Sequence, residues 1–140
     1  MNEVYIMSAT RSPVGAFGGS LKDFNPVDLG TIVAKESIKR SKISPKEIGH
    51  AVFGNVIHTE PRDMYVSRVI ALNSGLNKES CALTVNRLCG SGLQAIVSAS
   101  QLIFLGDTEI ALAGGVEVMS SGTHVVKGFR WGNRMGDSKV

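Results

Sequence analysis

Cysteine is scarce in this sequence, which contains only Cys81 and Cys89 among 140 residues. Two thiols are too few for the disulfide framework of a small secreted domain or for a cysteine-rich zinc site. If Cys81 opens a strand that ends near Asn86, extended residues at about 3.3 Å each separate the thiols by more than the ~7 Å limit for a bridge. We therefore expect two free thiols and a reducing compartment, most simply the cytoplasm.

Other signals are absent as well. The chain has no internal repeat, no Walker-type phosphate loop and no H-E-x-x-H metal pair, and its first eight residues do not form a signal or transit peptide. The longest uncharged stretch, Leu88 to Gly106, contains three Gly, three Ser and two Gln. This composition favours a helix buried in protein over a membrane span. Hydrophobic residues make up 43% of the chain, enough for one globular domain.

Positive charge is concentrated at one end. The net charge is +3, and residues 122–140 carry the whole excess, with Lys127, Arg130 and Arg134 beside Trp131. Such a segment can contact the phosphate of a cofactor or of nucleic acid, or it can be a solvated loop.

Hydrophobic runs and helical periods alternate along the chain. Asn25, Pro26 and Asp28 form a helix start, and Ser44 with Glu47 forms a capping box. The alternation predicts a βαβαβαβ order and an α/β fold with a parallel sheet covered on both faces. Ligand chemistry is then expected at the carboxyl ends of the strands. The expected strands cover 4–8, 51–57, 82–85 and 109–113, and the expected helices 26–41, 62–74 and 90–105.

Cys89 lies at the junction between a β-branched run and the uncharged helix. A sulfur in the first turn of a helix meets unpaired backbone N–H groups, which stabilise a thiolate. Gly90 and Gly92 clear side chains from its surroundings, so that a bulky thioester can approach. We interpret Cys89 as a nucleophile that accepts an acyl group; the alternative is a small buried cysteine that packs like alanine. Cys81 is expected only to pack.

A competing motif overlaps this junction. Residues 90–95 also satisfy G-x-G-x-x-A, the fingerprint of a dinucleotide-binding domain. That fingerprint requires an acid at the end of the next strand to hold a ribose hydroxyl. Glu109 precedes that strand and Glu117 follows two glycines beyond it, so neither is well placed.

Four groups of residues resemble the thiolases, the acyl-CoA C-acyltransferases. The turn around Cys89 resembles their acyl-enzyme signature. The chain also matches further family motifs, and all of them occur in the order that the family has. In the motif at 114–120, Val116 and Val118 replace the usual Met and Ser. These motifs lie at 10–15 and 17–19, at 114–120, and at 52–65, where the sequence is similar to β-ketothiolases of broad short-chain specificity.

The resemblance implies a five-layer α-β-α-β-α sandwich of two similar halves. It assigns 1–120 to most of the N-terminal half, which carries the nucleophilic Cys89, and 121–140 to the start of the loop domain and oligomerisation segment. The positively charged segment 122–140 resembles the family's loop near the tetramer contact and the CoA phosphate. From this resemblance we assign substrate binding to Arg130, Arg134 and Met135.

The resemblance also implies an activity. A thiolase condenses acetyl-CoA with acetyl-CoA or a short-chain acyl-CoA, or cleaves 3-ketoacyl-CoA by thiolysis, through an acyl-thioester on the counterpart of Cys89. We expect CoA thioesters as substrates, no cofactor or metal, a homodimer or homotetramer, and neither nucleic-acid nor membrane partners. The chain covers only about the first third of a thiolase and lacks the Gly-His-Pro and Cys-x-Gly-Gly motifs, so alone it is expected to be inactive. His58 is expected to line the pocket or a subunit contact. A non-catalytic interaction module and, less favoured, a dinucleotide-binding domain are the alternatives.

Overall fold

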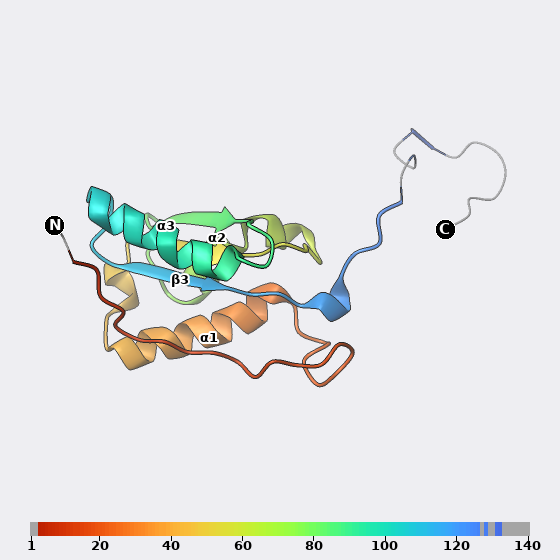
Figure 1. Cartoon of the computed structure of the whole chain (residues 1–140), viewed down its shortest axis with the longest axis horizontal. Helices are drawn as coiled ribbons and strands as arrows, with labels where there is room; N and C mark the ends of the chain where they lie inside the picture. The colour runs from red at the N-terminus through yellow and green to blue at the C-terminus, as the bar shows by residue number, and fades with distance from the viewer. Residues whose placement is uncertain (1–2, 127, 129–130, 133–140) are drawn as a thin grey trace.

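The computed structural model describes residues 3–126, 128, 131 and 132. A parallel sheet of three strands forms the centre, in the order β2-β1-β3. The strands are β1 (His50–Gly54), β2 (Cys81–Val85) and β3 (Ala111–Gly115). Helices cover both faces of this sheet (Figure 1). The predicted α/β class with a parallel, doubly covered sheet is confirmed.

Helix α1 (Pro26–Ser41) begins where the sequence predicts. The side chain of Asn25 accepts a hydrogen bond from the backbone N–H of Asp28 at 2.8 Å, and Pro26 occupies the first helical position. A single 3₁₀ turn, η1 (Pro45–Glu47), follows and carries the predicted capping box with Ser44. Local side-chain to backbone bonds therefore define both elements.

The predicted helix 62–74 is divided into two elements. A 3₁₀ helix, η2 (Pro61–Tyr65), precedes α2 (Val66–Asn73), and Gly75 ends the segment with φ +94°. The division coincides with Asp63 in η2. Its buried carboxylate accepts hydrogen bonds from the N–H groups of Thr59 and Glu60, the two residues before η2, and so holds η2 as a turn distinct from α2. Helix α3 (Ser91–Leu105) has Gly90 and Gly106 as its caps, and η3 (Met119–Ser121) follows β3.

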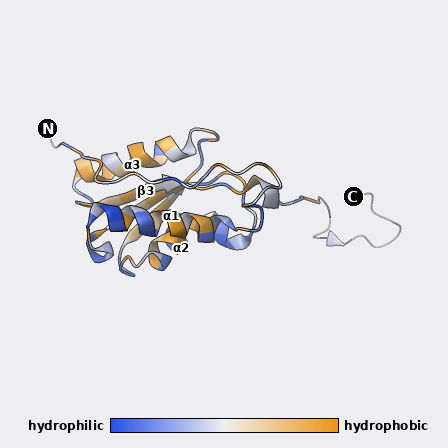
Figure 2. Ribbon diagram, turned by 90° about the horizontal axis from the view of Figure 1, so that it is seen from below, coloured by the Kyte–Doolittle hydropathy of each residue, from blue (hydrophilic) through white to orange (hydrophobic). Residues whose placement is uncertain are grey.

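The core consists of two clusters, one on each face of the sheet. Helices α1 and α2 lie on one face and α3 on the other, as Figure 2 shows. Strand β1 is buried on both sides: Ala51 and Phe53 belong to the larger cluster with α1 and α2, whereas Val52 packs against Ala95 and Ala99 of α3. This central strand therefore fixes the position of α3 relative to the other helices.

The prediction of a first strand at Val4–Ser8 is wrong. The segment has no strand pairing, and the described residues form three strands in place of the expected four. The hydroxyl of Ser8 donates to the carbonyl of Ser37 at 2.8 Å, and that of Thr10 to the carbonyl of Val33 at 3.1 Å. These bonds tie the segment along α1, where Figure 1 shows it running as an extended trace.

Among the residues that the structure describes, helix α3 is covered on one side only. Its small residues pack on the sheet, but on the opposite side Leu93 is 69% exposed and Phe104 51% exposed. The expectation of a helix buried in protein is thus met on one face. By length and composition, residues 88–105 are also long and apolar enough to cross a membrane, a test that core helices of soluble proteins pass as well.

Candidate functional site

Three loops leave the carboxyl ends of the three parallel strands at the same edge of the sheet. They comprise residues 55–60 after β1, 86–90 after β2 and 116–123 after β3. Parallel α/β sheets gather their ligand-binding groups at this edge. Cys89 lies in the second of these loops, as the sequence predicts.

Cys89 occupies a tight turn just before α3. The N–H of Gly90 donates to the carbonyl of Arg87 at 3.1 Å, and the N–H of Ser91 donates to the carbonyl of Leu88 at 3.0 Å. Leu88 has φ +50°, in the left-handed region that residues other than glycine rarely adopt. The sequence predicts Cys89 in the first turn of the helix, and this position is wrong. Because Gly90 is the N-cap, Cys89 precedes the first helical residue by two positions.

The surroundings of Cys89 leave backbone donors free. Among the described residues, no hydrogen bond uses the N–H groups of Cys89, Gly92 or Leu93. A Cβ built on Gly92 meets no atom within 4 Å, and the Cys89 residue is itself exposed. Free N–H groups at a helix start attract negative charge, so this turn combines an accessible thiol with donors suited to an oxyanion.

Asn55 and Glu117 join the loops after β1 and β3 to each other and to the end of β2. The N–H of Asn55 donates to the carbonyl of Val85, at the end of β2, at 3.2 Å, and its side-chain amide donates to the carbonyl of Val116 at 2.9 Å. The carboxylate of Glu117 accepts from the N–H groups of Val56 at 3.0 Å and of Ile57 at 2.8 Å. The sequence predicts a strand over 51–57, but β1 ends at Gly54, and residues 55–57 form these bonds instead. The bonds hold the loops after β1 and β3 together at the edge of the sheet that carries Cys89.

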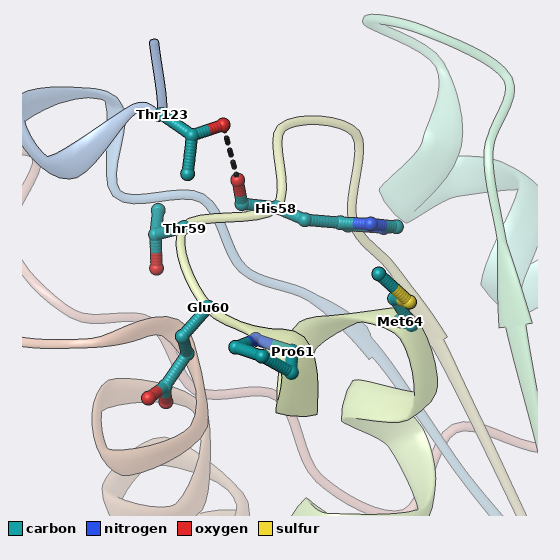
Figure 3. A pocket seen from close by; sticks show the side chains of 6 residues that line it. All are labelled: His58, Thr59, Glu60, Pro61, Met64 and Thr123. Carbon is teal, nitrogen blue, oxygen red and sulfur yellow. Dashed lines mark hydrogen bonds between the residues drawn. The ribbon is translucent and has the colours of Figure 1, made fainter. Parts of the chain in front are cut away.

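A buried carboxylate shapes the loop after β1. Asp63 is completely buried, and its Oδ2 accepts from the N–H and hydroxyl of Thr59 at 2.7 and 2.8 Å and from the N–H of Glu60 at 3.1 Å. The loop borders a pocket of about 270 Å³ (Figure 3). Its lining residues are His58, Thr59, Glu60, Pro61, Met64 and Thr123.

The other histidine and cysteine predictions have mixed outcomes. His58 is half-buried and lines this pocket, and its carbonyl accepts from the hydroxyl of Thr123 at 3.3 Å. Both thiols are free, as expected. The expectation that Cys81 serves only in packing is wrong, because β2 is an edge strand and leaves Cys81 exposed. The substrate-binding predictions for Arg130, Arg134 and Met135 lie outside the described residues.

Sequence reasoning missed the roles of Asn55, Asp63 and Glu117. We had considered Glu117 only as a ribose-binding acid, but its carboxylate is occupied by the backbone of the loop after β1. This occupancy argues against a dinucleotide site. Among the described residues, no group of three or more His, Cys, Asp and Glu side chains is arranged to hold a metal ion.

Comparisons with known proteins agree with this geometry. The chain is 56% identical over 136 residues to the beta-ketothiolase BktB of Cupriavidus necator. The matched region covers 97% of this chain and 34% of that protein. It is 41% identical over 133 residues to the human mitochondrial 3-ketoacyl-CoA thiolase, with 95% and 34% coverage. The crystal structure of that human thiolase in complex with CoA superposes with a TM-score of 0.91 at 40% identity, over 96% of this chain and 34% of that one.

The chain thus spans about a third of the length of the relatives that it matches. The family described as the N-terminal domain of thiolase matches residues 4–140. Because that match covers nearly every residue, including the turn of Cys89 and the loops around it, the chain belongs to the thiolase family.

Proposed function

We propose that the whole protein is an acyl-CoA C-acyltransferase in which Cys89 accepts the acyl group. The observation that carries this proposal is the exposed Cys89 on a turn whose neighbouring N–H groups have no acceptor among the described residues. An accessible thiol beside free backbone donors is the arrangement that thioester chemistry requires.

The reaction has two steps. The Cys89 thiolate attacks the carbonyl carbon of an acyl-CoA, a C–S bond forms, and CoA leaves as its thiolate. The carbanion of acetyl-CoA then attacks the new thioester, a C–C bond forms, and the Cys89 thiolate leaves; thiolysis is the reverse. Each step passes through an oxyanion, and one backbone donor contributes about 3 kcal/mol to its stabilisation. The base that deprotonates acetyl-CoA is expected from motifs that this chain does not contain.

The substrate class follows from the relatives. One is named a beta-ketothiolase, and another has been crystallised with CoA. We propose acetyl-CoA and short-chain acyl-CoA as substrates, without a further cofactor, and a role in fatty-acid metabolism. Arg130, Arg134 and Met135 are proposed to contact CoA or a neighbouring subunit of a homodimer or homotetramer. Two free thiols are consistent with a reducing compartment, and we propose the cytoplasm.

The test is acylation of the whole protein by radiolabelled acetyl-CoA, followed by peptide mapping. Label is expected on Cys89, and Cys89→Ala is expected to abolish it while CoA binding survives, since the adenine and phosphate ends are held elsewhere. The matched control is Cys81→Ala, which removes the other exposed thiol and is expected to leave the label unchanged. Label that persists in Cys89→Ala would refute the proposed role.

The same contrast can be tested on this chain. Iodoacetamide at neutral pH is expected to label Cys89 faster than Cys81, because only Cys89 lies beside free donors at a helix start. Both residues are exposed, so access alone does not predict a difference. Equal or faster labelling of Cys81 would contradict the assignment.

A second candidate function is a non-catalytic interaction module. The exposed apolar side of α3, with Leu93 and Phe104, favours it. A mass measurement of the native polypeptide discriminates the two. A mass near that of the relatives supports the acyltransferase, and a mass of 14.9 kDa supports the module.

A further inference from the structure

Ser91 is a buried polar residue directly behind the turn that carries Cys89. It is only 4% exposed, yet it is the first residue of α3. Its hydroxyl accepts a hydrogen bond from the N–H of Arg87 at 2.8 Å and donates one to the carbonyl of Leu88 at 2.6 Å. One side chain therefore binds the two residues that precede Cys89.

Leu88 needs such support. Its φ of +50° is one that a leucine rarely adopts, and its side chain is 70% exposed, so packing does not hold it in place. What holds it are hydrogen bonds. Its N–H donates to the side-chain oxygen of Asn86 at 3.0 Å, and its carbonyl accepts from both the N–H and the hydroxyl of Ser91.

Ser91 is itself held in place by the sheet. A Cβ built on Gly54, the last residue of β1, would lie 2.6 Å from both the Cβ and the carbonyl carbon of Ser91. Glycine at position 54 thus lets the start of α3 sit against the end of the central strand. The serine hydroxyl transmits this rigid placement to the turn.

We propose that Ser91 is a positioning residue for Cys89. Its hydroxyl holds Leu88 in the left-handed conformation, and this conformation presents the Cys89 thiol beside the free N–H groups of Cys89, Gly92 and Leu93. The inference deepens the proposed function, since it takes Cys89 as the nucleophile. It requires no acyl transfer for its test, so its failure can be told from failure of the proposed activity.

The first measurement uses the unsubstituted chain. Amide hydrogen exchange is expected to be slower at Arg87, whose N–H is bonded to Ser91, than at Cys89, whose N–H has no acceptor among the described residues. Both residues are exposed, which makes Cys89 an internal control. Exchange at Arg87 as fast as at Cys89 would mean that the bond is absent, and it would overturn the proposal even if no variant folds.

The second measurement is the rate of iodoacetamide alkylation of Cys89 in a Cys81→Ser background. Ser91→Ala is expected to slow alkylation about tenfold at neutral pH, because the thiolate is no longer held beside the free donors. In alkaline solution, where thiols in general react without help from neighbouring donors, the difference is expected to vanish. A merely structural defect would not produce a difference that depends on pH in this way.

Two further variants sharpen the result. Ser100→Ala removes a hydroxyl that bonds to the carbonyl of Ile96 in the same helix, far along the chain from the turn, and is expected to react as the unsubstituted chain does. Leu88→Gly in the Ser91→Ala background is expected to recover part of the rate, because glycine adopts a positive φ without penalty. Equal rates for Ser91→Ala and Ser100→Ala, or a difference that persists at alkaline pH, would overturn the proposal.

Discussion

Replacement of Gly54 by alanine tests the close contact between β1 and α3. The added Cβ would lie 2.6 Å from the carbonyl carbon and Cβ of Ser91 and 2.8 Å from its carbonyl oxygen. Two of these atoms belong to the backbone, so the start of α3 has to move. Overpacking of this kind costs up to about 3 kcal/mol, and the smaller entropy of the unfolded alanine chain offsets about 1 kcal/mol. The expected loss in the free energy of unfolding is about 2 kcal/mol.

Urea denaturation followed by circular dichroism measures this loss. With a slope of about 2 kcal/mol/M, the midpoint is expected to fall by about 1 M. Gly92→Ala is the matched control, because its Cβ meets no atom within 4 Å and alanine favours a helix by up to about 1 kcal/mol. Gly54→Ala with an unchanged midpoint, or Gly92→Ala with an equal loss, would refute the packing of α3 on the end of β1.

Three other outcomes are expected. Asp63→Ala removes the acceptor of three hydrogen bonds and is expected to lower the free energy of unfolding by about 2 to 3 kcal/mol, measured by urea denaturation; a change near zero would contradict its role in the loop. Leu93→Glu with Phe104→Glu is expected to reduce self-association and hydrophobic-dye binding, because the exposed side of α3 becomes polar; light scattering that shows the unsubstituted chain to be a monomer would contradict this expectation. Charge reversal at Arg130 and Arg134 in the whole protein is expected to raise the KM for acyl-CoA or dissociate tetramers, because each charge contributes about 1 kcal/mol of Coulomb attraction. An unchanged KM and an unchanged assembly at low salt would favour the alternative that the segment is a solvated loop.

The elements that the sequence predicts best are those that neighbouring residues define. Asn25 and Pro26 begin α1, Ser44 caps η1, and Gly106 closes α3 with φ +81°. In each case the donor and acceptor, or the permitted backbone angle, lie within a few residues of one another, so a local pattern contains the necessary information.

The site was predictable to the same extent. Glycines around Cys89 at a strand-to-helix junction indicated an accessible thiol on a turn, and the structure places it there. The exact position of Cys89, two residues ahead of α3, follows from bonds among Arg87, Leu88 and Ser91 that composition alone did not indicate.

Tertiary structure decided the features that depend on distant partners. The segment at Val4–Ser8 has the composition of a strand, but pairing requires a neighbouring strand, and side-chain bonds to α1 hold it elsewhere. Asn55 and Glu117 are 62 positions apart, yet they meet because parallel strands bring their carboxyl ends together. Local hydrogen bonds and permitted dihedral angles are determined by the sequence itself, whereas strand pairing and long-range bonds form only when the sheet brings remote residues into contact.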